Sequence, residues 1–195
     1  GGGTDPLAIP GATDIAVFSA TSVAVAQTVN LNADRSLLGL SFTSGQAHGL
    51  LAGGTNRILT LGASGINKSG AGAITIGSAT AGQQVAVALA ADQTWTNTNA
   101  TGAISVLNGV SSNAAGARIL TLNGTSTANN NIAGIIANGS GTVSLVKNGT
   151  GTWILNGANT YSGGTTISGG TLAISAASGT NAAGGSLTGF GSGAV

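Results

Sequence analysis

The sequence predicts an all-β protein whose strands coil into a parallel β-solenoid, or β-helix. Short strand-like stretches recur along its 195 residues, and turns rich in glycine and asparagine separate them. Residues 145–175 show both features most clearly. Because side chains of a strand point alternately to opposite faces, we expect Trp153 and Leu155 to share one face and Ile154 to take the other. Asparagine and glycine tolerate positive φ angles, so the chain can turn sharply after each strand.

Strand-like stretches cover the whole chain, and helical periodicity is weak throughout. Residues 85–92 could form a short helix, but their Val-Ala alternation favours a strand. Short strands at fairly even spacing are typical of sandwiches, barrels and solenoids. The predicted strands are residues 15–18, 23–25, 38–42, 58–61, 73–76, 85–89, 104–107, 119–122, 132–136, 143–146, 153–155, 165–167 and 172–174.

Internal repeats favour the solenoid. Residues 57–61 recur as 118–122, an offset of 118 − 57 = 61, and the 68–74 pattern recurs at 147–153, an offset of 147 − 68 = 79. The second offset exceeds the first by 79 − 61 = 18, which is close to the length of one coil. A solenoid accepts an extra coil easily, because each coil contacts only its neighbours. Five Asn-Gly pairs, which also favour hairpins, leave an antiparallel β domain open as the alternative.

We therefore expect an irregular segment at residues 1–30, followed by a solenoid over 31–195 with two related copies at about 57–117 and 118–175. At roughly 20 to 25 residues per coil, the chain would make roughly eight to ten coils. With about 4.8 Å between strands, the rod would be roughly 40 to 45 Å long. Neither end of the sequence resembles an export signal or a stop, so we expect a fragment or module of a longer exported protein.

Composition narrows the function classes. Only 5% of residues are charged and the net charge is +1, so the chain lacks the basic footprint of a nucleic-acid-binding protein. A mean hydropathy of +0.37 argues against disorder. The absence of cysteine removes disulfides and thiolate metal sites. No run of about 18 apolar residues occurs, so we expect no transmembrane helix.

Residues with catalytic chemistry are few and scattered. Glycoside hydrolysis needs paired carboxylates, whereas this chain has four dispersed aspartates and no glutamate. The single histidine, His48, lies in a glycine-rich stretch, where we expect an exposed loop side chain rather than an activating base. No calcium-binding nonapeptide or phosphate-binding loop occurs. We therefore expect no catalytic, cofactor or metal site and no enzyme activity, with a polysaccharide-acting enzyme as the least favoured alternative.

Residues 145–175 carry an ordered set of residues that resembles a known repeat. The set comprises Lys147, Asn148, Gly149, Gly151, Thr152, Leu155, residues 157–161, 163–167 and 170–172. It resembles the passenger-associated, or autotransporter-associated, β-strand repeat, and residues 34–35, 40–43, 59–61 and 91–96 look like segments that accompany it. The resemblance implies a right-handed parallel β-helix, exported and exposed at the bacterial surface as an adhesin, fibre or stalk. Trp153 and Ile154 depart from it, because the family usually carries Leu-Thr there.

Alternation also predicts which apolar residues face outward. If Leu59, Leu120 and Trp153 point inward, then Ile58, Ile119 and Ile154 point outward. If Leu38, Leu40 and Phe42 point inward, Leu37 points outward as well. Large apolar side chains on outer faces with hardly any charge around them favour contact with copies of the same chain. We therefore expect a secreted or cell-surface structural protein that forms or extends a fibre or stalk through self-association. The alternative is an adhesin that binds glycans or surfaces, with Trp95 as a weak candidate glycan contact.

Overall fold

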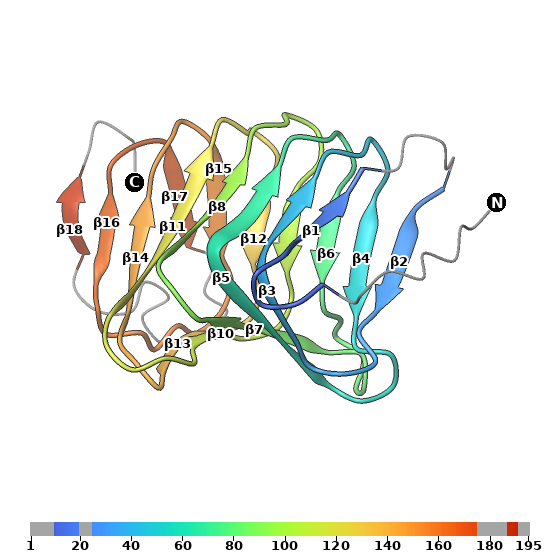
Figure 1. Cartoon of the computed structure of the whole chain (residues 1–195). Helices are drawn as coiled ribbons and strands as arrows, with labels where there is room; N and C mark the ends of the chain where they lie inside the picture. The colour runs from blue at the N-terminus through green and yellow to red at the C-terminus, as the bar shows by residue number, and fades with distance from the viewer. Residues whose placement is uncertain (1–9, 20–24, 175–186, 191–195) are drawn as a thin grey trace.

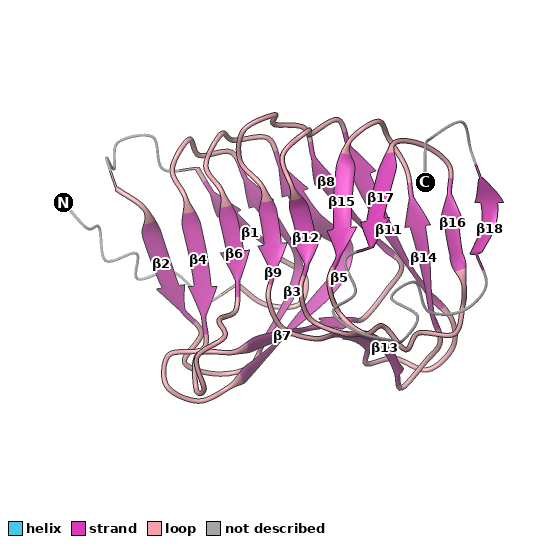
Figure 2. Ribbon diagram, turned by 180° about the vertical axis from the view of Figure 1, so that it is seen from behind, coloured by secondary structure: helices cyan, strands magenta, loops and turns pink. Residues whose placement is uncertain are grey.

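Short strands and sharp turns build a three-sided parallel β-solenoid, seen from opposite sides in Figures 1 and 2. In this computed structural model the structure describes residues 10–19, 25–174 and 187–190. Every strand pair among them is parallel. In Figure 1 the front strands point up and the rear strands point down while the chain advances from the N-terminal to the C-terminal end. The solenoid is therefore right-handed, as the resemblance implied.

The three faces are named here by their position in Figure 1. The front face consists of β1 (Ile15–Phe18), the second halves of β3 (Arg35–Phe42) and β5 (Arg57–Lys68), β8 (Gln93–Asn97), β11 (Arg118–Gly124), β14 (Val143–Lys147), β16 (Thr165–Ile167) and β18 (Leu187–Phe190). The rear face consists of β2 (Gln27–Asn30), β4 (His48–Leu51), β6 (Ile74–Ile76), β9 (Ile104–Val106), β12 (Asn130–Ile132), β15 (Thr152–Leu155) and β17 (Thr171–Ile174). The lower face consists of the first halves of β3 and β5, then β7 (Val85–Leu89), β10 (Val110–Ser112) and β13 (Ile136–Gly139).

The predicted fold class is confirmed, but the predicted number of coils is wrong. The described solenoid makes about five three-stranded turns, followed by shorter turns at its C-terminal end. Leu40 pairs with Ile66 and Ile66 with Trp95, so the spacing of successive turns in the sequence is 66 − 40 = 26 and then 95 − 66 = 29. Three strands and three corners need more chain per turn than the sequence-based estimate assumed. The later step from Lys147 to Ile167 is shorter, with a spacing of 167 − 147 = 20.

None of the Asn-Gly pairs lies in a hairpin: three lie in corners between strands, and the other two, at 123–124 and 138–139, end the parallel strands β11 and β13, which removes the antiparallel alternative. Asn148 and Gly149 turn the chain from β14 on the front face to β15 on the rear face, and Gly149 has a φ of +68°. The two related segments differ in position. Residues 57–61 lie on the lower face and pair with β7, whereas residues 118–122 run along the front face and pair with β14. The offset between them is therefore not a whole number of turns.

The core fills the bore of the solenoid with stacked rows of inward side chains. One row on the rear face, which we call the rear inner column, runs Val29, Leu50, Ile76, Val106, Ile132, Leu155 and Ile174 in consecutive turns. Its five middle members are at most 1% exposed. Nearer the C-terminal end the rings of Trp95 and Trp153 lie 6.4 Å apart and are both buried. Each turn thus buries the apolar face of the next.

One predicted outward residue points inward. Leu37 is only 7% exposed, because the pairing of β3 with β5 shifts register between Leu37 and Gly39, where β3 bends from the lower face to the front face. Alternation counted from Leu40 cannot be carried across such a corner. Leu37 therefore belongs to the core and not to an interaction surface.

Several glycines allow the turns to approach closely, and Gly72 gives a direct test. A Cβ atom at Gly72 would lie 1.8 Å from the backbone oxygen of Gln46 in the preceding turn, whereas at Gly45 it would meet nothing within 4 Å. We expect Gly72→Ala to lower the free energy of unfolding by about 3 kcal/mol, since backbone must move. Gly45→Ala should change it by less than about 0.5 kcal/mol. Urea unfolding of both variants checks this, and equal losses would contradict it.

Candidate interaction surfaces

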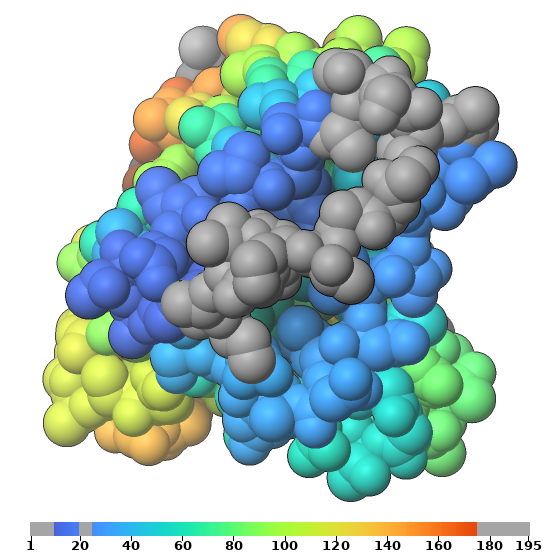
Figure 3. All heavy atoms as spheres, turned by 45° about the vertical axis from the view of Figure 1, so that its right-hand side comes forward, coloured from blue at the N-terminus to red at the C-terminus, as the bar shows by residue number. Residues whose placement is uncertain are grey.

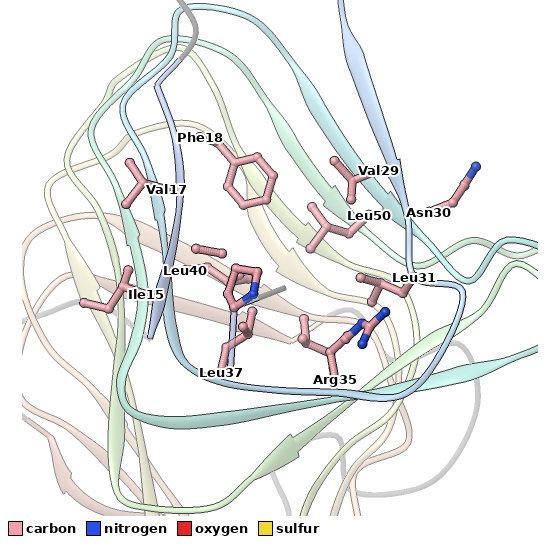
Figure 4. A pocket seen from close by; sticks show the side chains of 13 residues that line it. Ile15, Val17, Phe18, Val29, Asn30, Leu31, Arg35, Leu37, Leu40 and Leu50 are labelled. Atoms are coloured by element: carbon pink, nitrogen blue, oxygen red, sulfur yellow. The ribbon is translucent and has the colours of Figure 1, made fainter. Parts of the chain in front are cut away.

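The N-terminal end of the solenoid is hollow and apolar. A cavity of about 440 Å³ opens there, and Figure 3 turns this end toward the viewer. In Figure 4 the side chains of Phe18, Val29 and Leu50 border one side of the cavity, and Leu37 and Arg35 border the other. Arg35 is the one charged residue in this lining. Such a cavity can bury apolar side chains, but it offers no groups that would activate a nucleophile.

A second surface runs along the outside of the lower face. Ile58 pairs with Ala86, and Gly109 and Ile135 continue the same outward row in the next two turns. Ile58 and Ile135 are each 48% exposed, and hollows of about 490 and 470 Å³ lie beside this row. We call this row and its hollows the lower groove. Ile58 and Ile135 project from the lower groove, and the small residues Ala86 and Gly109 lie between them.

Polar groups at the rim of the lower groove are already bonded to the fold. Asn56 accepts hydrogen bonds from the backbone N–H groups of Gly82 and Gln84 at 2.9 and 3.3 Å. Asn108 accepts from the N–H groups of Ser78 and Val85 at 3.2 and 3.0 Å. These bonds join one turn to the next, so the amides stabilise the coil and leave little capacity for a ligand.

The aspartates have structural partners as well. Asp34 accepts a hydrogen bond from the backbone N–H of Ile58, and Asp92 accepts one from that of Ile119, each at 2.9 Å. Asp5 lies outside the described residues. Within the described part of the chain, no group of three or more metal-ligating side chains comes together. That same part contains no helix long and apolar enough to span a membrane.

The structure separates the predicted outward residues instead of gathering them into one patch. Ile58 lies on the lower face, Ile119 (41% exposed) lies in the front-face strand β11, and Ile154 is half-buried on the rear face. Ile135, which lies in the row of Ile58, was not predicted, because the sequence was assigned one strand over 132–136. In the structure β12 ends at Ile132 and β13 begins at Ile136, so Ile135 lies in the corner between them.

The predicted glycan contact is wrong. Trp95 is fully buried, and its indole N–H donates to Oε1 of Gln93 at 2.9 Å inside the solenoid. A ring in this position cannot stack on a sugar in the folded chain. Trp153 is also buried, as its alternation with Leu155 predicted.

The prediction for His48 is also wrong, since it is buried rather than exposed in a loop. It begins β4, is 5% exposed, and lies 5.4 and 5.9 Å from the stacked rings of Phe18 and Phe42. Neither ring nitrogen has a hydrogen-bond partner among the described residues. Burial in these surroundings lowers the pKa of His48, because the charged imidazolium loses its hydration.

This burial should make the protein sensitive to mild acid. The unfolded chain takes up a proton on His48 more readily than the folded chain, so the free energy of unfolding should fall as pH falls below about 6.5. His48 is the only histidine and glutamate is absent, so no other side chain ordinarily titrates between pH 5 and 6.5. Urea midpoints should decrease across this window for the natural chain and stay level for His48→Leu. The same decrease in both would contradict the assignment.

Two lysines point into the core at the corner between the front and rear faces. Nζ of Lys147 donates to the backbone oxygens of Asn148, Gly149 and Gly169 at 2.6, 3.0 and 3.1 Å. Nζ of Lys68 donates to the oxygen of Gly70 at 2.6 Å. Three carbonyls match the three donors of an ammonium group. Burial nevertheless lowers the pKa of each lysine to about 8.

The Lys147 corner belongs to a recognisable repeat. Residues 145–174, which form β14 to β17 and the corners between them, match the family described as Passenger-associated-transport-repeat. This segment is similar to a passenger-associated transport repeat. Leu145 pairs with Thr165 in the following turn, so the repeat comprises one turn and the start of the next. No curated protein and no solved structure matches the chain.

The repeat indicates which class of protein this solenoid resembles. Together, the passenger-associated transport repeat and the β-solenoid point to a passenger-type surface protein, with the secreted or surface location that this family implies. Lys147 and the buried Tyr161, whose hydroxyl lies 2.6 Å from that of Thr165, both fall within the repeat. Side chains of the repeat therefore stabilise one turn of the solenoid through buried hydrogen bonds.

Proposed function

We propose that this chain is a stiff, non-catalytic module of a bacterial surface protein, and that it forms or extends a stalk or fibre. The observation that carries the proposal is the rear face, in which seven strands from β2 to β17 pair in one parallel ladder over an unbroken inner column. Each turn is bonded and packed to its neighbours, so bending or stretching must break several backbone hydrogen bonds together.

A non-catalytic role is supported by the use of the polar groups. Asp34 and Asp92 accept hydrogen bonds from backbone N–H groups, and Lys68 and Lys147 donate hydrogen bonds to backbone carbonyls. His48 lies against the ring of Phe18. These side chains hold turns together at separate places along the solenoid. The proposed partners are copies of the chain, which would meet along exposed apolar surfaces such as the lower groove.

An adhesin is the second candidate. The lower groove favours it, because hydroxyl groups of Ser36, Thr60 and Ser111 line one of its hollows beside Ile58. A glycan chain lying along the axis would meet this row in successive turns. Binding to a glycan array that is lost in Ile58→Asp and kept in Ile119→Asp would favour the adhesin over the stalk.

Stiffness can be measured directly, because the chain has no cysteine to interfere with labelling. Thr28 and Ala173 lie in one outward row of the rear face, six turns apart. Spin labels on Thr28→Cys/Ala173→Cys at high dilution should give one narrow distance of about 29 Å, which is six steps of about 4.8 Å. A broad distribution of distances would contradict a stiff module.

An antibody to the chain should stain intact cells of the bacterium that makes it, and staining only after permeabilisation would contradict the surface location.

A further inference from the structure

We infer that the lower groove binds an acidic polysaccharide, with the carboxylate of a uronic-acid residue held by the guanidinium of Arg57. This inference rests on the adhesin candidate of the proposed function and names the class of glycan that the groove would select. It does not depend on the stalk, because the groove lies on the outside of the lower face and leaves the packing of the bore unchanged.

Arg57 is the group that gives the groove its preference for a charge. It lines the hollow of about 490 Å³, and no other charged residue lines that hollow. Its Nε is buried and has no hydrogen-bond partner among the described residues. The amide oxygens of Asn56 and Asn108 beside it already accept backbone N–H groups. A ligand oxygen bound by Arg57 would satisfy a buried donor that the described fold leaves unpaired.

The chemistry of a guanidinium favours a carboxylate as the bound group. Arginine is always charged, and its N–H groups form a planar fork that matches the two oxygens of a carboxylate. The second hollow, of about 470 Å³, is lined by both Asp34 and Arg35, so its charges are balanced. The groove therefore offers one place for a single carboxylate, beside a stretch suited to an uncharged part of the same ligand.

That uncharged part fits a sugar better than a peptide. Strands β7 and β10 are paired along both edges, so their backbone cannot pair with an incoming peptide strand. The side chains instead offer hydroxyl groups, from Ser36, Thr60 and Ser111, and the apolar surface of Ile58. Hydroxyls and C–H faces are what a pyranose ring presents. The two hollows share Ile58 and Ala86, so one extended glycan can cross both.

Binding of defined oligosaccharides tests the carboxylate. Hexasaccharides of galacturonate, mannuronate and guluronate are titrated into the natural chain by calorimetry, each beside its methyl ester, which has the same sugar chain without the charge. At least one acid should bind about tenfold more tightly than its ester, since a hydrogen bond to a charged group is at stake. Added salt should weaken binding of the acid and leave that of the ester unchanged.

The two related segments supply the matched pair of variants. Residues 57–61 and 118–122 have the same sequence, and Nε of Arg118 is buried without a partner like that of Arg57. Arg118 lines neither hollow. Arg57→Gln should bind the acid no better than the ester, whereas Arg118→Gln should keep the natural preference. Arg57→Lys keeps the charge without the fork and should retain part of the preference. Urea midpoints of the three variants confirm that each is folded.

Several outcomes would overturn the inference. Equal affinity of the natural chain for acids and esters would exclude recognition of the carboxylate, and an equal loss in Arg118→Gln would exclude Arg57 as its site. Polyglutamate that binds as tightly as the best uronate would replace the glycan by an acidic peptide. If only uncharged glycans bind, and Ile58→Asp abolishes that binding, the inference fails and the adhesin candidate stands. If no glycan on the array binds, both fail, and the spin-label distance still decides the stiff module.

Discussion

Replacing Trp153 by alanine is expected to lower the free energy of unfolding by about 3–5 kcal/mol. The indole is 1% exposed, donates its N–H to the backbone oxygen of Asn123 at 3.3 Å, and lies 6.4 Å from the ring of Trp95. Alanine would leave a large cavity between turns that are otherwise closely packed, and the neighbouring strands cannot close it without breaking their register. Equilibrium urea unfolding of the natural chain and the variant measures the loss.

The adjacent residue supplies the control. Ile154 shares the strand of Trp153 but points to the opposite side, where it is half-buried. Ile154→Ala should cost about 1 kcal/mol or less. Similar losses at both positions would show that the alternation of β15 does not decide which side chain supports the core. Because turns contact only their neighbours, hydrogen exchange in Trp153→Ala should rise first in β12, β15 and β17.

The second large effect is expected at alkaline pH, where the two buried lysines titrate. Lys68 and Lys147 have a pKa of about 8 in the folded chain, against an ordinary value of 10.5. At pH values between these two pKa values, each lysine is mostly protonated in the unfolded chain and mostly deprotonated in the folded chain. The free energy of unfolding therefore rises with pH, by about 2 kcal/mol per lysine from pH 8 to pH 10.

The measurement is a series of urea unfolding curves between pH 8 and 10. Lys147→Met should remove about half of the increase, because one of the two buried amines is gone. Above pH 10 the raised pKa of Tyr161 acts in the opposite direction, since the unfolded phenol then loses its proton first. A level or falling curve between pH 8 and 10 in the natural chain would contradict the assignment of the two lysines.

Local alternation was sufficient to predict the strands whose inward residues are apolar, such as β7, β9 and β15. It failed where inward residues are polar. Strand β8 was not predicted, because Gln93 and Asn97 point into the core and break the apolar pattern. Both amides are satisfied inside, by the backbone oxygens of Leu61 and Gly102 respectively. A sequence does not show which polar side chains will find such partners in another turn.

The outward residues of the candidate surfaces could also be predicted only in part. Ile58 and Ile119 were correctly placed outside, because each lies next to a strand with clear alternation. Leu37 was misplaced because a corner falls between it and the residue from which the count began. The exposure of Val29 and Ile174 could not be predicted, since both occupy inward positions. They lie in β2 and β17, the outer strands of the rear sheet among the described residues, and a local pattern does not show which strand is an outer one.

The withdrawal of Lys68 and Lys147 into the core has an electrostatic consequence. Without them the chain's remaining charged side chains are three arginines and four aspartates, so a formal net charge of +1 becomes −1 outside the core. Copies of such a rod hardly repel one another at any distance, and added salt has little repulsion to screen. Encounter between copies should therefore proceed at much the same rate in dilute and in concentrated salt, and apolar contact alone should decide whether they stay together.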